Sequence, residues 1–201
     1  MKKFIFLLLI IFILILTGCQ AKIKAVALGD SITYGLPYGP VGSWVRYASN
    51  DKTEIINKGV NGETTGQMLS RFAEDVVRSR PDFVIILGGT NDAFYNLSLE
   101  QYQNNIAAMV QMARQNKITP VLGIPIPVNE ATYESRLKIF RRWLTDYARE
   151  NKIQVIDFYS ALADSGTGYL SNQYNLDNVH PNAAGYHKMA ELVSLQKQQK
   201  R

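Results

Sequence analysis

Four short polar segments contain the side chains whose types and spacing could support a chemical reaction. They are 29–35, 59–64, 88–92 and 177–182. The first contains a serine, the second and third are glycine-rich and each contain an asparagine, and the fourth contains an Asp-x-x-His pair. Each segment taken alone is equally typical of a turn or a helix cap, because Asp, Ser, Asn and Gly are common at both. Together they contain the groups that acyl transfer through a serine requires.

A serine hydroxyl is a poor nucleophile at neutral pH and needs an adjacent base, which in turn needs an acceptor that orients it. Ser31 is the candidate nucleophile, His180 the candidate base and Asp177 its candidate partner. The tetrahedral intermediate also needs hydrogen-bond donors aimed at its oxyanion. The backbone N–H groups of Ser31 and Gly62 and the side-chain amide of Asn91 are suitable donors.

The elements that must position these side chains follow from the hydrophobic pattern. Short apolar runs alternate with longer amphipathic ones, which favours parallel strands joined by helices in an α/β fold. The expected strands are 24–28, 53–57, 83–87, 119–123 and 154–157, and the expected helices are 43–50, 65–79, 98–116, 131–150 and 182–196. Because ligands bind at the carboxyl ends of such strands, the four polar segments are expected to meet there.

The segment 98–116 gives the clearest helical signal. Ser98 followed by Gln101 predicts a capping box. The apolar side chains that would share one face are Leu99, Tyr102, Ile106, Met109, Val110 and Ala113.

Asp30 and Asp92 flank the candidate serine and asparagine. We expect each carboxylate to accept hydrogen bonds from nearby backbone N–H groups and to order its loop, rather than to take part in proton transfer.

The four segments, in this order, resemble the blocks of the SGNH hydrolases, also called GDSL-type esterases or lipases, over about residues 24–192. The resemblance implies a flavodoxin-like three-layer α/β/α sandwich with a five-stranded parallel sheet, and hydrolysis of carboxylic esters or thioesters through an acyl-serine. It assigns Ser31, His180 and Asp177 to catalysis and Ser31, Gly62 and Asn91 to the oxyanion hole. It implies no metal and no organic cofactor. Candidate substrates are short or medium acyl esters, lysophospholipid-like esters, thioesters and O-acetylated glycans.

The first residues form a separate signal. Lys2 and Lys3 precede an apolar run over 4–16, which is typical of a secretory signal and short for a membrane span. The four residues 16–19, Leu-Thr-Gly-Cys, resemble a bacterial lipobox, so Cys19 is the expected lipidation site. The alternative is an uncleaved N-terminal anchor. The expected organisation is a signal peptide over 1–18, a lipid-anchored tether over 19–23, the hydrolase domain over 24–196 and a polar basic tail over 197–201.

Composition narrows the function classes further. The chain has 22 Lys and Arg against 17 Asp and Glu, and removal of residues 1–18 takes away two lysines, so the net charge falls from +5 to +3 (20 minus 17). Basic residues are not interleaved with aromatic ones as in a nucleic-acid groove, so no nucleic-acid partner is expected. The single cysteine excludes an intramolecular disulfide framework. We expect a monomer in the cell envelope, outside the cytoplasm and membrane-anchored.

Two other functions remain open at this stage. A lipoprotein that binds envelope glycans through a vestigial site would keep the fold without turnover. A glycan O-acyltransferase would use the same acyl-serine and transfer the acyl group to a sugar hydroxyl in place of water.

Overall fold

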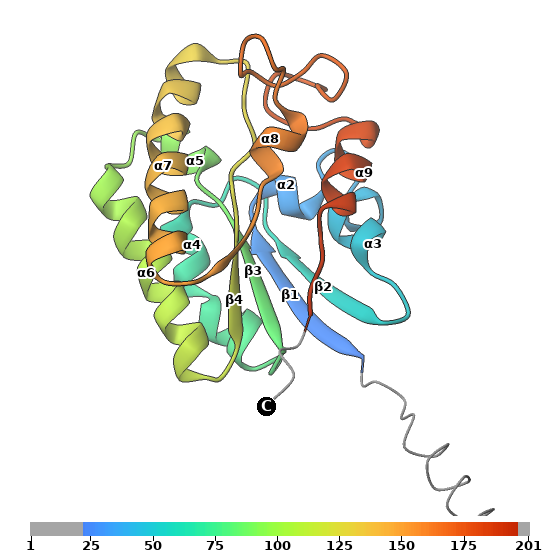
Figure 1. Ribbon diagram of the computed structural model, residues 1–201, viewed down its shortest axis with the longest axis vertical. Coiled ribbons are helices and arrows are strands. Elements are labelled where there is room, and N and C mark those ends of the chain that lie inside the picture. Colours follow the sequence, from blue (N-terminus) through green and yellow to red (C-terminus); the bar gives the residue numbers. More distant parts are fainter. Residues whose placement is uncertain (1–21, 197–201) are drawn as a thin grey trace, which may run out of the picture.

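The computed structural model describes residues 22–196, which fold around one five-stranded sheet (Figure 1). All strands are parallel and lie in the order β2-β1-β3-β4-β5. Their bounds are β1 Ile23–Gly29, β2 Thr53–Gly59, β3 Phe83–Leu87, β4 Thr119–Gly123 and β5 Gln154–Ile156. This order is the flavodoxin-like one, so the expected fold class is confirmed.

Helices cover both faces of the sheet (Figure 1). The helices over one face are α4 Thr65–Ser70, the π-helix η2 Ala73–Val77, α6 Leu99–Gln115 and α7 Ala131–Glu150. Those over the other face are α3 Trp44–Ala48, α8 Phe158–Leu162 and α9 Ala183–Glu191. Three short helices lie in loops: α2 Ser31–Tyr34, η1 Pro40–Gly42 and α5 Thr90–Phe94.

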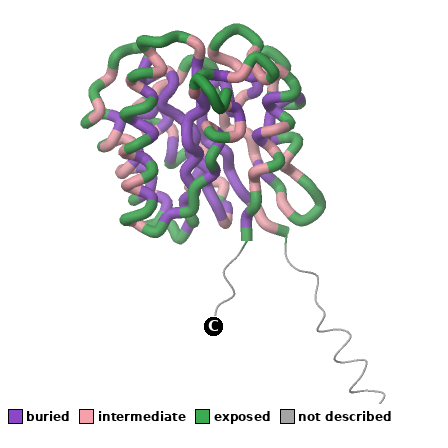
Figure 2. Tube along the Cα trace, turned by 45° about the horizontal axis from the view of Figure 1, so that its top comes forward, coloured by how far each residue is buried: buried purple, intermediate pink, exposed green. Residues whose placement is uncertain are grey.

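The two cores follow from the alternation of side chains along each strand. Val26 and Leu28 of β1 point to the face that packs on α6 and α7, whereas Ala25 and Ala27 point to the face under α3 and α9. Strand β3 is buried at all five positions, as a central parallel strand covered by helices requires. Figure 2 shows the buried residues concentrated in the strands and on the inward sides of the helices.

Helix α6 forms as its sequence pattern predicts. The Ser98 hydroxyl accepts a hydrogen bond from the Gln101 backbone N–H at 3.1 Å, and the Gln101 side chain accepts one from the Ser98 N–H at 2.9 Å. The whole apolar face packs into the core under this side of the sheet. A capping box and a 3.6-residue period are local signals, so they suffice to place this helix.

Other element bounds differ from the expected ones. The helix expected over 65–79 is interrupted at Arg71, where α4 ends before the π-helix η2 begins. The last helix ends at Glu191 rather than at residue 196, and β5 stops at Ile156 because Asp157 caps α8. Helices α2, α5 and α8 are too short to show a periodic pattern. The signal segment, Cys19 and the tail lie outside the described residues. No helix within residues 22–196 is long and apolar enough to cross a membrane.

The loops that follow β1 and β3 lie at the point where the strand order reverses. From β1 the chain passes to β2 on one side, and the later strands β3, β4 and β5 follow on the other side. Helix α2 packs closely on the end of β2 there. A Cβ atom on Gly59 would lie 2.1 Å from the Tyr34 backbone nitrogen. The absence of a side chain at Gly59 therefore sets how near α2 lies to the sheet.

We expect Gly59→Ala to lower the free energy of unfolding by about 2 kcal/mol or more, because the clash is with backbone and α2 must shift. The matched control is Gly66→Ala in α4, where the nearest atom to an added Cβ is the Asn105 side-chain nitrogen at 3.4 Å. This control should be neutral or slightly stabilising, since Ala favours the helix. Urea unfolding of both variants measures the effect, and equal midpoints would contradict the proposed close packing.

Candidate active site

The structure brings Ser31, His180 and Asp177 into one hydrogen-bonded chain. The Ser31 Oγ atom lies 2.9 Å from His180 Nε2. On the other side of the ring, His180 Nδ1 lies 2.8 Å from Asp177 Oδ2 and 3.1 Å from Oδ1. These contacts have the geometry of a nucleophile, a base and an orienting carboxylate.

A tight turn holds Asp177 beside His180. The Asp177 Oδ1 atom accepts hydrogen bonds from the backbone N–H groups of Val179 at 3.1 Å and His180 at 2.8 Å. Asn178, which follows Asp177, adopts a left-handed conformation with φ 75°, which asparagine tolerates better than most residues. Partial burial raises the pKa of Asp177, but the hydrogen bonds from His180 and Val179 outweigh it and leave the pKa below the ordinary value. The carboxylate is therefore ionised when it faces the imidazole.

Ser31 is the first residue of α2, directly after β1. The Asp30 side chain caps this helix by accepting a hydrogen bond from the Ile32 N–H at 2.9 Å. The helix ends after one turn at Gly35, which has φ 100° and whose N–H donates to the Ser31 carbonyl. Ser31 itself is 8% exposed. The cap and the glycine end thus hold the hydroxyl at the carboxyl end of the sheet.

The three candidate oxyanion donors follow three neighbouring strands: Ser31 after β1, Gly62 after β2 and Asn91 after β3. Within residues 22–196, the backbone N–H groups of Ser31 and Gly62 donate no hydrogen bond. Gly62 has φ 78°, and an added Cβ would meet open space. One hydrogen of the Asn91 amide is used by the Glu63 carbonyl, with 2.9 Å between Nδ2 and the oxygen, so the other remains for a ligand.

Asp92 ties the third of these loops to the second. Its carboxylate accepts hydrogen bonds from the Thr65 hydroxyl at 2.5 Å and from the Thr65 N–H at 3.0 Å. Burial raises the pKa of Asp92, and the bonds from Thr65 oppose that rise. Both aspartates that flank the site thus accept bonds from nearby backbone N–H groups, as expected, and the Asp92 bonds keep Asn91 close to Gly62.

Two arginines that were not among the predicted site residues stabilise the loops around the site through hydrogen bonds and ion pairs. Arg71 donates to the carbonyls of Gly29 at 3.2 Å and Lys58 at 3.0 Å, and its guanidinium pairs with Glu63 and Asp75. It therefore joins the ends of β1 and β2 to the loop that carries Gly62. No local pattern marks such a residue, because its partners lie far along the chain.

The second arginine is Arg141 of α7, which forms a buried ion pair with Glu134. Arg141 also donates to the carbonyls of Pro125 and Ile126, while Glu134 accepts from the Val128 N–H at 3.0 Å. The ion pair thus fixes the loop that follows β4.

That loop contacts the turn that carries Asp177 and His180. The Asn129 N–H donates to the Asn178 carbonyl at 2.8 Å, between Asp177 and His180. The charge pair in α7 is therefore connected to the Asp-His turn through two loops, and Asn129 is the link between them.

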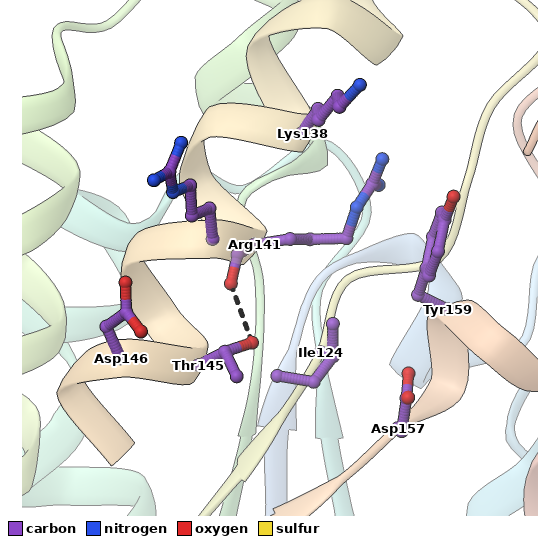
Figure 3. A pocket seen from close by; sticks show the side chains of 8 residues that line it. Ile124, Lys138, Arg141, Thr145, Asp146, Asp157 and Tyr159 are labelled. Carbon is purple, nitrogen blue, oxygen red and sulfur yellow. Dashed lines mark hydrogen bonds between the residues drawn. The ribbon is translucent and has the colours of Figure 1, made fainter. Parts of the chain in front are cut away.

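A cavity of about 450 Å³ opens beside α7 and the segment after β5, and the triad residues do not line it (Figure 3). The Arg141 guanidinium lies in this wall, 4.2 Å from the centroid of the Tyr159 ring. The lining residues are Ile124, Lys138, Arg141, Arg142, Thr145, Asp146, Asp157 and Tyr159. Cationic and anionic side chains both line this cavity, so its charge does not single out one ligand. Within residues 22–196, no group of three or more His, Cys, Asp or Glu side chains is arranged to hold a metal ion.

The fully buried Asp30 makes stability depend on pH. Burial raises its pKa to about 7, against the opposing bond from the Ile32 N–H, and the nearby Asp92 charge raises it further. The unfolded chain would release this proton near the ordinary value of 3.8, so the folded state loses stability as the pH rises from about 4 through 7.

We expect Asp30→Asn to keep the helix cap and to remove this loss. The unfolding free energy of the variant relative to the natural chain should rise by roughly 2 to 3 kcal/mol between pH 5 and pH 8. Asp51→Asn, on an exposed loop, controls for the loss of one carboxylate. Urea midpoints at the two pH values measure the change, and parallel pH profiles for the Asp30 variant and the natural chain would contradict it.

Comparison with known proteins places the chain in a family. Residues 27–188 match the GDSL-like Lipase/Acylhydrolase family. The uncharacterized lipoprotein YqeF of Bacillus subtilis is 30% identical over 159 residues, which cover 71% of this chain and 65% of YqeF, just under two thirds of that relative. Esterase TesA of Pseudomonas aeruginosa is 26% identical over 197 residues, which cover 90% of this chain and 94% of TesA.

The solved structures agree with this assignment. A structure from Desulfitobacterium hafniense, described as a lipolytic protein of the G-D-S-L family, superposes with a TM-score of 0.79 at 36% identity and covers 84% of this chain and 96% of that one. The resemblance to the SGNH hydrolases read from the four segments is thereby confirmed. The chain belongs to the GDSL-like lipase/acylhydrolase family, a family of carboxylic ester hydrolases.

Proposed function

We propose that this protein hydrolyses carboxylic acyl esters through an acyl-serine formed on Ser31. The observation that carries the proposal is the continuous chain of hydrogen bonds from Ser31 Oγ through the His180 ring to the Asp177 carboxylate. Membership of an acylhydrolase family supports the reaction class. The relatives' names support ester substrates in general rather than one particular ester.

In the first step Ser31 Oγ attacks the acyl carbonyl carbon, and its proton passes to His180 Nε2. The resulting imidazolium is stabilised by the ionised Asp177. The imidazolium then gives the proton to the leaving alcohol as the carbon–oxygen bond breaks, which leaves the acyl-serine. A water molecule, deprotonated by the same imidazole, releases the acid and restores Ser31.

The negative oxygen that forms in both steps is stabilised by the N–H groups of Ser31 and Gly62 and by the free amide hydrogen of Asn91. Support comes from the two unpaired backbone donors and from the bond to Glu63 that fixes the Asn91 side chain. Donors held in place before the reaction require no reorganisation when the charge develops.

The surroundings of the site favour an ester with an apolar portion. Phe94, the last residue of α5, and Tyr95, which follows it, lie three and four residues after Asn91 and are 52% and 60% exposed. The Phe94 ring packs against Tyr133 of α7, with 4.9 Å between ring centroids. This aromatic cluster at the same edge as Ser31 offers apolar surface to an acyl chain or to the flat face of a sugar.

We also propose that the mature protein is held outside the cytoplasm by lipid on Cys19. The apolar run over 4–16 and the four residues that end at Cys19 support this location. The relative YqeF, aligned over 71% of this chain, is named as a lipoprotein.

The direct test is hydrolysis of p-nitrophenyl esters from acetate to long acyl chains by the natural chain and by Ser31→Ala. We expect turnover by the natural chain and a loss of at least 10³-fold in kcat for the variant, because the nucleophile is absent. The acyl length with the highest kcat/KM reports the size of the acyl pocket. A folded natural chain that turns over no ester or thioester would overturn the proposal.

The oxyanion role has its own test. Asn91→Ala should lower kcat about 10²-fold, as loss of one donor usually does, with a loss of only about 1 kcal/mol in stability from the missing bond to Glu63. The matched control is Asn172→Ala, an exposed asparagine without a side-chain hydrogen bond within residues 22–196. An unchanged kcat for the Asn91 variant would remove this residue from the oxyanion hole.

A further inference from the structure

Each of the five strands is entered through an exposed basic residue. Lys22 precedes β1, Lys52 precedes β2, Arg80 precedes β3, Lys117 precedes β4 and Lys152 precedes β5. We call the loops that enter the strands the amino edge. None of the ion pairs formed within residues 22–196 includes these five side chains.

The carboxylates in the same loops are fewer. They are Asp51, before β2, and Asp82, before β3. The amino edge is therefore a basic surface even when its own acidic side chains are counted.

The opposite edge, which holds the candidate active site, has the reverse charge. The segments that leave the five strands are 30–43, 60–64, 88–98, 124–130 and 157–182, and none of them contains a lysine or an arginine. The carboxylates in these segments that are not buried are Glu63, Glu130, Asp157, Asp164 and Asp177, of which Glu63 pairs with Arg71. The domain thus presents cations at one end of its sheet and carboxylates at the other.

Backbone conformation and helix dipoles do not account for a basic residue before every strand. Arg80, Lys117 and Lys152 have φ of 46°, 60° and 53°, the left-handed region in which glycine or asparagine is easier to accommodate. The dipoles of α6 and α7 favour a cation near Lys117 and Lys152. They do not account for Lys22 and Lys52, which no long helix precedes.

The first and last described residues lie at the same edge as these cations. Figure 1 shows the described chain beginning before β1 and ending below the sheet, at the amino ends of the strands. Beyond residue 196 the sequence adds Lys197, Lys200 and Arg201. Within residues 22–196, the chain therefore begins and ends at the edge that carries the five cations.

The segment between Cys19 and β1 is too short for the domain to lie on the bilayer with its Ser31 edge. Four residue steps separate Cys19 from Ile23, the first residue of β1, and they span at most about 14 Å when fully extended. The seven residues of β1, which are six steps, rise about 20 Å towards Ser31. To rest on the bilayer with the Ser31 edge, the domain would need a tether at least as long as that strand.

We propose that the amino edge is a membrane-facing surface that lies on the anionic headgroups of the bilayer holding the anchor, and that the active site opens away from it. Each Lys or Arg near an anionic surface contributes about 1 kcal/mol of attraction. The inference rests on the proposed esterase function and on the anchor at Cys19. It restricts the substrate to esters that reach the site from the aqueous side, and excludes acyl esters embedded in the anchoring bilayer.

The test uses the full chain, produced in a bacterial host as the lipoprotein and reconstituted in vesicles of phosphatidylcholine with phosphatidylglycerol. A fluorescent thiol probe is placed either at the amino edge, by Thr119→Cys, or beside the candidate site, by Tyr95→Cys; both positions are exposed. Quenching by lipids with a nitroxide on the headgroup then reports which edge lies near the bilayer. Cys19 is the only natural cysteine, so an unsubstituted chain that takes up label would show a free thiol and overturn the anchor.

We expect quenching at residue 119 to be several-fold stronger than at residue 95. Equal quenching, or stronger quenching at residue 95, would overturn the proposed orientation.

The role of charge is tested separately. The combined variant Lys52→Glu, Arg80→Glu and Lys117→Glu should shift the equilibrium away from the bilayer-bound orientation by at least about 100-fold in anionic vesicles, and so reduce quenching at residue 119. The control Arg46→Glu, Lys138→Glu and Arg142→Glu changes the net charge equally at exposed helical positions and should leave quenching unchanged. Loss of quenching in both variants, or in neither, would overturn the electrostatic contribution.

Activity separates this inference from the proposed function. The reconstituted natural chain should hydrolyse a water-soluble p-nitrophenyl ester as fast as in detergent, and should hydrolyse a lysophospholipid supplied in micelles faster than the same lipid in its own bilayer. Faster hydrolysis in its own bilayer would overturn the orientation. Hydrolysis of no ester in any form would overturn the esterase function, while the quenching result would still decide which edge faces the membrane.

Discussion

The hydrogen bond between Ser31 Oγ and His180 Nε2 joins residues 149 positions apart, and most of the fold is arranged around it. Ser31 is presented by one short helical turn after β1. His180 lies in the long segment between α8 and α9, which has little regular structure of its own. For the two atoms to meet at 2.9 Å, the sheet must bring the first strand beside the helices of the last quarter of the chain. The parallel order β2-β1-β3-β4-β5 accomplishes this.

The three aspartates near this bond differ in burial, and their pKa values and hydrogen-bond partners differ accordingly. Asp177 is half exposed and accepts several hydrogen bonds, so its pKa is lowered and its charge is available to an imidazolium. Asp30 and Asp92 are buried, which raises their pKa, and they bind backbone N–H groups instead. A carboxylate stabilises an imidazolium only where it stays ionised. Within residues 22–196, neither buried carboxylate hydrogen-bonds to Ser31 Oγ or to the His180 ring, so both hold loops in place.

The two faces of the sheet are alike in being apolar, whereas its two edges differ in charge. Both faces are apolar and covered by helices, as a parallel sheet requires. The edges carry the functional differences: donors and carboxylates where the strands end, cations where they begin. With the proposed anchor at Cys19, the length of β1 would separate the membrane from the candidate active site and so give the domain a defined orientation.

The sequence by itself determined the strands, the long helices and the residues of the candidate site, because hydrophobic period, capping boxes and motif spacing act over a few neighbouring positions. Helix α6, the Ser31 turn and the Asp177–His180 pair are of this kind. The flavodoxin-like strand order was expected only from the family resemblance, and only the tertiary structure decided the break at Arg71 and the buried pair of Arg141 with Glu134. These features depend on contacts between residues distant in the chain, and such contacts leave no local pattern to detect.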